Sequence, residues 1–127
     1  MTNNDIKTTN VSITGATLNK SEVANPCGII AYSYFNDFYS ILYDNLTNIS
    51  TITTEGINWA SDIDRLSITD ASKMWLNITD PRVINWMRIS TIPTFRKLWA
   101  RINHDIEPGQ YRLNVTKSIG NVIKITI

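Results

Sequence analysis

The sequence has 127 residues, of which 43% are hydrophobic and 18% charged, with a net charge of +1. A chain of this length fits one domain with one core, and the composition lacks the low hydrophobicity and high net charge of disordered proteins. The charge is uneven, because residues 1–81 hold four Lys and Arg against nine Asp and Glu, whereas residues 82–127 hold eight against two. This asymmetry indicates either a surface for nucleic acid or a membrane, or two halves of one fold that neutralise each other, and we prefer the second interpretation.

The sequence shows no targeting or transmembrane segment. Its start, MTNNDIKTTN, lacks the basic and apolar regions of a signal peptide, and its most apolar window, CGIIAYSYFNDFYSILY, is shorter than the about 20 residues that span a bilayer. The single cysteine, Cys27, cannot form an internal disulfide and by itself suggests either a reducing compartment or a missing partner cysteine. The N-x-S/T sequons suggest the opposite, since 14 Asn and 25 Ser or Thr predict about three by chance, whereas six occur. They begin at Asn10, Asn19, Asn45, Asn48, Asn77 and Asn114.

The first part of the chain is polar. Residues 1–24 are rich in Thr, Asn and Ser, so we expect a flexible start with one possible edge strand, followed by a domain over residues 25–127. Asn25 and Pro26 are favourable at a helix start and predict a short helix over residues 26–35. The segment FYSILYD is rich in aromatic and β-branched residues and predicts a strand, and TNISTITTEG predicts a further strand and turn.

The middle of the chain holds a second helix signal. The segments GINWASDIDRLSI and DASKMWLNIT are expected to be strands or extended. Asp80 and Pro81 repeat the pattern of a helix start, and the apolar residues after them recur at helical spacing, which predicts a helix over residues 81–90. This helix must end before Pro93, because the residue before a proline favours extended geometry.

The segment TFRKLWARI fits two templates. Its large apolar residues recur at helical spacing, as a helix requires. A strand fits as well: it would place Leu98, Ala100 and Ile102 on one face with Arg96, and on the other face cations could lie on rings, with Phe95, Lys97, Trp99 and Arg101. Downstream, EPGQ places Pro108 and Gly109 as a type II turn requires, and YRLNVT alternates apolar and polar residues. We therefore predict a strand for TFRKLWARI, a hairpin into YRLNVT, and a return through Gly120 into VIKITI. The expected fold is mainly β with minor helix.

Catalytic and metal-binding interpretations find little support. His104 and Cys27 are the only histidine and cysteine, so the chain offers neither a nucleophile–base pair nor a cluster of N and S metal ligands. Asp62 and Asp64 imitate the D-x-D motif of metal-dependent glycosyl transfer, but two acids in a polar loop are common. The four tryptophans are expected to fill the core. We expect no catalytic residue, no metal and no cofactor.

The most unusual segment is NWMRISTIPTFRKLWARI, residues 85–102, which holds three aromatic rings, three Arg and one Lys without an acid. One hypothesis is a soluble module that binds nucleic acid or sugar through phosphate contacts and stacking. The other is a structural ridge whose arginines pair with acids in this chain or on a partner protein. In that ridge Trp86 and Phe95 would anchor the core, and removing either ring would cost roughly 3–5 kcal/mol.

Four blocks of the sequence occur in the order found in one known family. They are NPCGIIAYSYFND, GINWASD, DPRVINWMRISTIPTFRKLWARI and GQYRLNVT. These blocks resemble signatures of the non-catalytic β-subunits of phospholipid flippases, the family called cell division control protein 50 or ligand-effect modulator 3. The resemblance runs from Asn25 to about Thr116 with gaps between the blocks, and the block from W-M-R to F-R-K-L is very specific.

The resemblance implies a β-rich, sandwich-like exoplasmic domain, held in full-length members by two transmembrane helices and stabilised by disulfides and N-glycans. It implies a partner, the catalytic subunit of a phospholipid-transporting P-type ATPase. The subunit would perform no chemistry itself and would support folding of the ATPase, its export from the endoplasmic reticulum and its phospholipid translocation. Its membrane would be the endoplasmic reticulum, the Golgi or the plasma membrane, with this domain on the lumenal or extracellular side.

The resemblance also implies roles for individual residues. Asn114 matches a glycosylated position of the family, with Asn45, Asn77 and Asn10 as further candidates, and Cys27 would pair with a cysteine that this chain lacks. The expected structural or partner-facing residues are Trp86, Arg88, Pro93, Phe95 and Arg96. Because the membrane helices and the cysteine-bearing region before P-C-G are missing, and KSIGNVIKITI replaces the family's ending, we expect the C-terminal part of an exoplasmic domain.

Overall fold

The computed structural model describes residues 1–6, 10–34, 38–43, 52–116 and 121–126. They fall into two compact units. The first, here named the helical unit, combines Met1–Tyr34 with Gly56–Trp99, and the second, the sheet unit, combines Phe35–Glu55 with Ala100–Ile127. The described helices are short and the described strands are antiparallel, which confirms the predicted mainly β class with minor helix.

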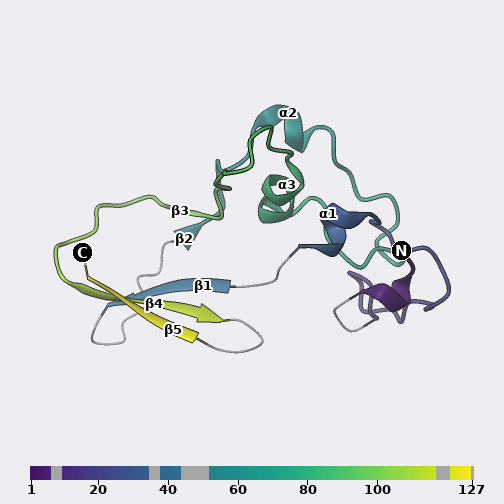
Figure 1. Ribbon diagram of the computed structural model, residues 1–127, viewed down its shortest axis with the longest axis horizontal. Coiled ribbons are helices and arrows are strands. Elements are labelled where there is room, and N and C mark those ends of the chain that lie inside the picture. The colour runs from purple at the N-terminus through teal and green to yellow at the C-terminus, as the bar shows by residue number, and fades with distance from the viewer. Residues whose placement is uncertain (7–9, 35–37, 44–51, 117–120, 127) are drawn as a thin grey trace. The chain divides into compact units, whose positions relative to one another are not determined.

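The sheet unit is built on a three-stranded antiparallel sheet with the strand order β1-β4-β5 (Figure 1). Its strands are β1 (Phe38–Tyr43), β4 (Gln110–Thr116) and β5 (Asn121–Thr126). Each was predicted from its apolar, β-branched or alternating sequence. The central strand is β4, so its backbone groups pair on both sides: Asn114 is opposite Ser40 of β1 and Val122 of β5.

The predicted hairpin between TFRKLWARI and YRLNVT is wrong. Of that first segment only β3 (Arg101–Ile102) is a strand, and it pairs with β2 (Ile52–Thr53) in a separate two-stranded sheet. The preceding residues are bonded to side chains instead, because the carbonyl of Leu98 accepts a hydrogen bond from the Asn85 amide at 2.8 Å. The Asn85 side chain thus holds one point of this extended segment, which lies outside both described sheets.

In the helical unit, α3 (Pro81–Met87) starts as predicted. The Asp80 carboxylate accepts a hydrogen bond from the backbone N–H of Arg82 at 2.8 Å, and Pro81 occupies the first turn. The helix ends three residues earlier than expected, because Arg88 already has extended geometry. No helix in the described parts of the chain has the length and apolar character needed to cross a bilayer.

Two other expectations for this unit need correction. The helix expected over residues 26–35 is only α1 (Ile29–Tyr32), and its N-cap is Gly28, not Asn25. The carbonyl of Asn25 instead accepts a hydrogen bond from the N–H of Trp75 at 2.9 Å, next to a parallel bridge to Met74. The expected extended segment around residues 56–68 contains α2 (Ala60–Ile63), whose first turn holds Asp62, an acid that suits a helix N-terminus.

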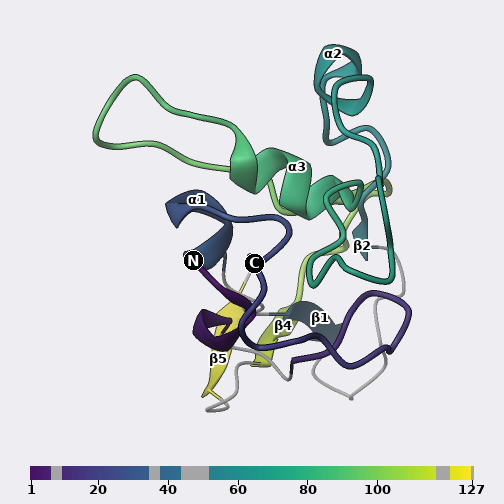
Figure 2. The same cartoon turned by 90° about the vertical axis from the view of Figure 1, so that its right-hand side faces the viewer.

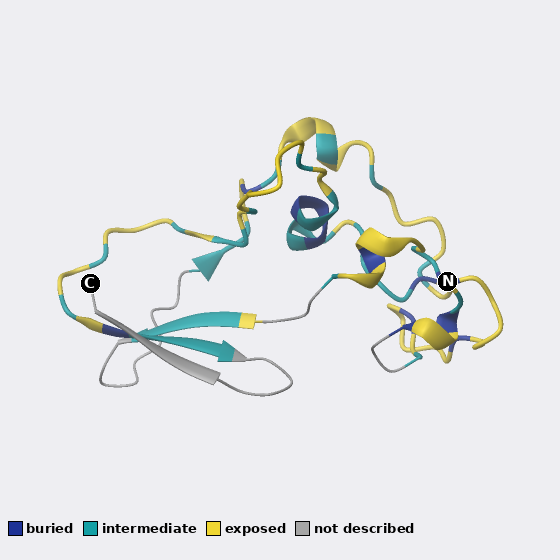
Figure 3. Cartoon of the chain, in the orientation of Figure 1, coloured by how far each residue is buried: buried dark blue, intermediate teal, exposed yellow. Residues whose placement is uncertain are grey.

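Buried side chains concentrate in the helical unit among the described residues (Figure 3). One face of α3 buries Val83 and Ile84, and Met74 is also fully buried. A separate cluster joins Ile6, Leu18 and Ala24, with the Trp75 ring packed against it. Residues 1–24, which also contain the short 3-10 helix η1 (Asn3–Asp5), therefore contribute to the packing of this unit. The division of the chain at residue 24 stays a prediction.

Candidate functional site

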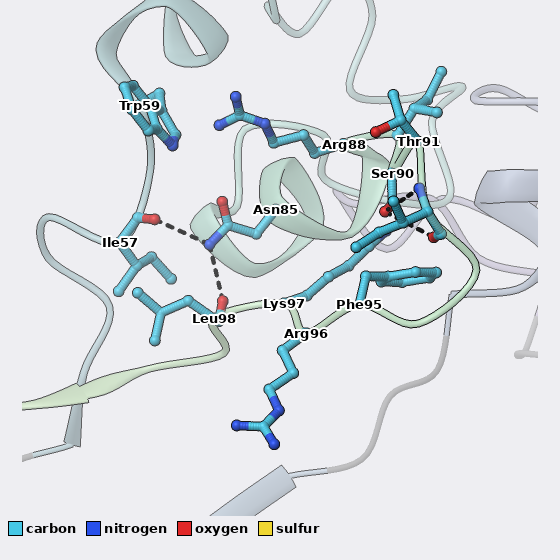
Figure 4. A pocket seen from close by; sticks show the side chains of 12 residues that line it. Ile57, Trp59, Asn85, Arg88, Ser90, Thr91, Phe95, Arg96, Lys97 and Leu98 are labelled. Carbon is cyan, nitrogen blue, oxygen red and sulfur yellow. Dashed lines mark hydrogen bonds between the residues drawn. The ribbon is translucent and has the colours of Figure 1, made fainter.

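The candidate site is an open pocket of about 550 Å³ in the helical unit (Figure 4). The loop that follows α3 projects from that helix, as Figure 2 shows, and forms one side of the pocket. The other side comes from the segment before α2. We name it the aromatic–basic pocket and define it by Ile57, Trp59, Asn85 and residues 88–92 and 95–98. Its volume falls within the about 300–1,000 Å³ that is usual for ligand sites.

Asn85 of α3 fixes the two sides of the aromatic–basic pocket (Figure 4). The side chain is 9% exposed, and its Nδ2 donates to the carbonyl oxygens of Ile57 at 3.0 Å and Leu98 at 2.8 Å. Its Oδ1 accepts from Nδ2 of Asn58 at 3.0 Å. Because every polar atom of this buried amide has a partner, the two segments are held in place before any ligand arrives.

Cations lie on the aromatic rings of the site. The Arg88 guanidinium is 5.0 Å from the centre of the Trp59 ring, and the Lys97 ammonium is 4.8 Å from that of Trp86 and 5.4 Å from that of Phe95. Elsewhere in the unit Arg82 covers the Trp99 ring at 4.0 Å. Cations therefore lie on rings here, but not on one face of a strand as the sequence predicted, because the pairs join α3 and loops that are distant in the chain, apart from Lys97 with Phe95.

The charged residues that line the pocket are all basic. Its lining contains Arg88, Arg96 and Lys97 but no carboxylate. Arg88 forms an ion pair of 3.2 Å with Asp62, and the Lys97 ammonium donates to the carbonyl of Trp86. Burial lowers the pKa of Lys97 below its ordinary value, because its charged form loses hydration. The pocket therefore favours a ligand that brings negative charge.

The structure places the predicted structural or partner-facing residues in one region. Arg88, Phe95 and Arg96 line the pocket, whereas Pro93 is exposed in the loop outside the lining. Trp86 is not among the lining residues, and its Nε1 donates to the carbonyl of Ile30 at 3.0 Å. Phe95 is 53% exposed, so the expectation that it anchors the core is wrong. Its ring instead forms part of the open wall.

Sequence reasoning missed the residue that organises the site. In the sequence analysis Asn85 was only the first residue of the basic aromatic segment. Its side chain bonds to the carbonyl of Ile57, which is 28 residues away in the chain. One signal was present: Asn85 stands among apolar residues of the predicted helix, at a position that faces the core. A polar side chain on such a face needs buried partners, and carbonyl groups of adjacent loops supply them here.

The D-x-D imitation at Asp62 and Asp64 gains no support as a metal site from the structure. Asp62 pairs with Arg88 and has no second carboxylate as its partner. The described residues contain no group of three His, Cys, Asp or Glu that could hold a metal ion. What the described residues offer here is binding surface and positive charge.

The sequons and the cysteine occupy different settings. Asn77 is partly exposed, and its Oδ1 accepts from the Thr79 hydroxyl at 2.7 Å. Asn10 and Asn114 are half-buried, the latter in the central strand β4. Asn45 lies outside the described residues. Cys27 is exposed as a free thiol, and its proposed pairing stays a prediction.

Comparisons with known proteins agree on one family. The model of the LEM3 (ligand-effect modulator 3) family / CDC50 family matches residues 2–119. ALA-interacting subunit 3 of Arabidopsis thaliana is 36% identical over 100 residues, which cover 66% of this chain and 28% of that protein. The phospholipid-transporting ATPase accessory subunit LEM3 of Saccharomyces cerevisiae is 32% identical over 116 residues, with coverage of 71% and 28%. Cell cycle control protein 50A of Rattus norvegicus is 28% identical over 139 residues, with coverage of 77% and 42%.

The alignments with these three relatives cover between 28% and 42% of the relatives' lengths. No solved structure shows significant similarity to this chain. The family match includes the whole aromatic–basic pocket and all of β1 and β4. The chain belongs to the LEM3/CDC50 family.

Proposed function

We propose that this chain forms part of the exoplasmic domain of a non-catalytic accessory subunit of a phospholipid-transporting P-type ATPase. Family membership supports this proposal, because the yeast relative is named as an accessory subunit of such an ATPase. The observation that carries it is structural: the most specific block of the sequence, DPRVINWMRISTIPTFRKLWARI, supplies α3 and most of one preorganised pocket with exposed apolar walls.

The exposed apolar side chains of this pocket favour a protein partner. Ile89 is 80% exposed, and Ile92, Phe95 and Leu98 are exposed as well. Large apolar side chains that gather on one surface and remain in contact with water are typical of an interaction site. Three cations in the same lining would add electrostatic selectivity to such a contact.

The proposed role is to bind, and the chemistry belongs to the ATPase. By binding the exoplasmic part of the catalytic subunit, the domain would stabilise its folded state, assist its export from the endoplasmic reticulum and support phospholipid translocation. The domain would lie on the lumenal or extracellular side of the membrane of the endoplasmic reticulum, Golgi or cell surface. There the sequons would be glycosylated, with Asn114 as the first candidate and Asn45, Asn77 and Asn10 as further ones.

Co-expression tests this proposal. The chain, directed to the secretory pathway, is expressed with each phospholipid-transporting P-type ATPase of the same genome, and co-purification and exit of the ATPase from the endoplasmic reticulum are measured. We expect one ATPase to co-purify, and an Asn114→Gln variant to lose part of the mass that endoglycosidase removes. An Asn103→Gln variant is the control, because Asn103 is not in a sequon.

The alternative, a nucleic-acid-binding module, predicts a different result. Such a chain would co-purify with no ATPase and would bind RNA with an affinity that falls steeply as salt rises, because neutralised phosphates release counterions. That result would contradict the accessory-subunit proposal.

A further inference from the structure

The aromatic–basic pocket combines an apolar wall with three basic side chains and no acidic one in its lining, and this combination specifies a ligand chemistry. We infer that the pocket takes a polypeptide segment of the partner in which an apolar side chain is flanked by carboxylates. The inference rests on the proposed function, since it names the chemistry of the segment through which that partner docks.

The apolar part of the pocket selects the anchor of such a segment. Ile57 is buried at the back of the pocket, and Leu98 lies beside it (Figure 4). Ile89 and Phe95 extend the apolar surface outward and are mostly in contact with water. A leucine or phenylalanine side chain that enters the pocket would remove both its own surface and theirs from water, which is the main favourable term in association.

The charges of the pocket select what flanks the anchor. Asp62 neutralises Arg88 only from the side of α2. Among the described residues no carboxylate forms an ion pair with Arg96 or Lys97, and the lining itself contains no acid. Charge complementarity across an interface gives specificity. The matching segment therefore carries Asp or Glu beside its anchor.

Two other occupants fit the geometry less well. Nucleic-acid bases stack on open ring faces, but Arg88 already covers Trp59, and Lys97 lies on Phe95. A bilayer surface is broad, whereas these side chains surround a hollow of about 550 Å³. A side chain that projects from a peptide enters such a hollow, and the headgroup layer of a membrane does not.

Synthetic peptides test the inference on the purified chain. Three probes have the form Gly-X-Leu-Phe-X-Gly, with X as Asp, Asn or Lys, and a fourth has Asp at X but Ser-Ser in place of Leu-Phe. Binding is measured by the change in tryptophan fluorescence and by calorimetry. We expect the Asp probe to bind most tightly, the Asn probe about fivefold more weakly for each lost carboxylate, and the Lys and Ser-Ser probes not measurably.

A matched pair of substitutions locates the binding. Ile89→Ser removes an apolar side chain that is 80% exposed and lines the pocket, so we expect the Asp probe to bind about tenfold more weakly. Ile29→Ser removes one that is 82% exposed in α1, outside the lining, and should leave affinity within about twofold. Arg96→Glu changes the summed charge of the lining residues from +3 to +1, so it should weaken the preference for the Asp probe over the Asn probe.

The outcomes separate this inference from the proposed function. Equal affinity for the Asp and Asn probes, or equal effects of Ile89→Ser and Ile29→Ser, would overturn the inference. The same holds if phosphatidylserine vesicles or oligouridylate bind at Ile89 while the peptides do not. If the chain co-purifies with an ATPase in either case, the proposed function stands and docking occurs elsewhere. Loss of co-purification in Ile89→Ser but not in Ile29→Ser, together with weaker binding of the Asp probe, would support both.

Discussion

Different kinds of hydrogen bond stabilise the helical unit and the sheet unit internally. In the helical unit, side chains bond to backbone groups of segments far away in the chain: Asn85 to Ile57, Trp75 to Pro26 and Trp86 to Ile30. In the sheet unit, two ladders of backbone pairs join β4 to β1 and β5. Among the residues of the sheet unit whose burial the structure describes, which exclude β5, Tyr111 alone is buried.

This difference indicates how each unit responds to substitution. A unit held by individual side chains can build an irregular pocket, because the chain between the bonds need not follow a regular element. It also depends strongly on those few side chains. A unit held by backbone ladders tolerates many changes of side chain but few changes of backbone geometry.

The largest effect is expected from a backbone change in the sheet unit. Leu113→Pro in β4 removes a backbone donor from the central strand and should destabilise the sheet by about 3 kcal/mol or more. Leu113→Ala keeps the ladder and removes only a half-buried side chain, so it should cost about 1 kcal/mol. Hydrogen exchange of the amides in β1 and β4 measures both, and similar protection in the two variants would break the comparison.

The next largest effect is expected from one side chain of the helical unit. Asn85→Leu leaves the carbonyl groups of Ile57 and Leu98 without their donor and should cost about 3 kcal/mol of unfolding free energy. Asn103→Leu, at an exposed position, should change it by less than about 0.5 kcal/mol. Denaturant unfolding followed by tryptophan fluorescence compares the two. Equal effects would show that the amide of Asn85 does not organise the unit.

A smaller effect should separate two rings that sequence reasoning treated alike. Trp86→Phe removes the donor to the Ile30 carbonyl and weakens the contact of the ring with Lys97, so we expect a loss of about 1.5 kcal/mol. Phe95→Leu changes a mostly exposed ring and should cost less than about 0.5 kcal/mol. Thermal unfolding of the two variants shows which substitution costs more stability. A larger loss of stability for Phe95→Leu would contradict this order and indicate that the Phe95 ring packs in the core.

The smallest effect concerns a single turn of the helical unit. The Asp70 carboxylate accepts hydrogen bonds from the Ser72 hydroxyl at 2.6 Å and the Ser72 N–H at 3.0 Å, which lower the pKa of Asp70 below its ordinary value of 3.8. A carboxylate whose pKa is lowered by folding contributes stability that is present above the unfolded pKa and is lost as the pH falls through the folded pKa. Ser72→Ala should raise the pKa of Asp70 toward 3.8, as an NMR titration would show. An unchanged titration would assign the shift to the backbone N–H alone.

The sequence predicted the features that depend on neighbouring residues. The start of α3 follows from Asp80 and Pro81, and β1 and β4 follow from their own composition. The pairing of β3 with β2 could not be predicted in this way, because Ile52 and Ile102 meet across 50 positions of the chain. For the same reason the sequence indicated only one side of the pocket. The cations and Phe95 stand in one segment of the chain, but Ile57 and Trp59 come from another.

During synthesis the residues of the helical unit are complete before those of the sheet unit. The helical unit is assembled from Met1–Tyr34 and Gly56–Trp99, so all of its residues have been synthesised before the second part of the sheet unit begins at Ala100. Strand β1 belongs to the intervening segment, and its partner β4 begins only at Gln110. On a ribosome that adds about 5–20 residues per second, several seconds therefore pass between the synthesis of β1 and that of β4. During that interval the edge of β1 that pairs with β4 in the folded chain has no partner strand.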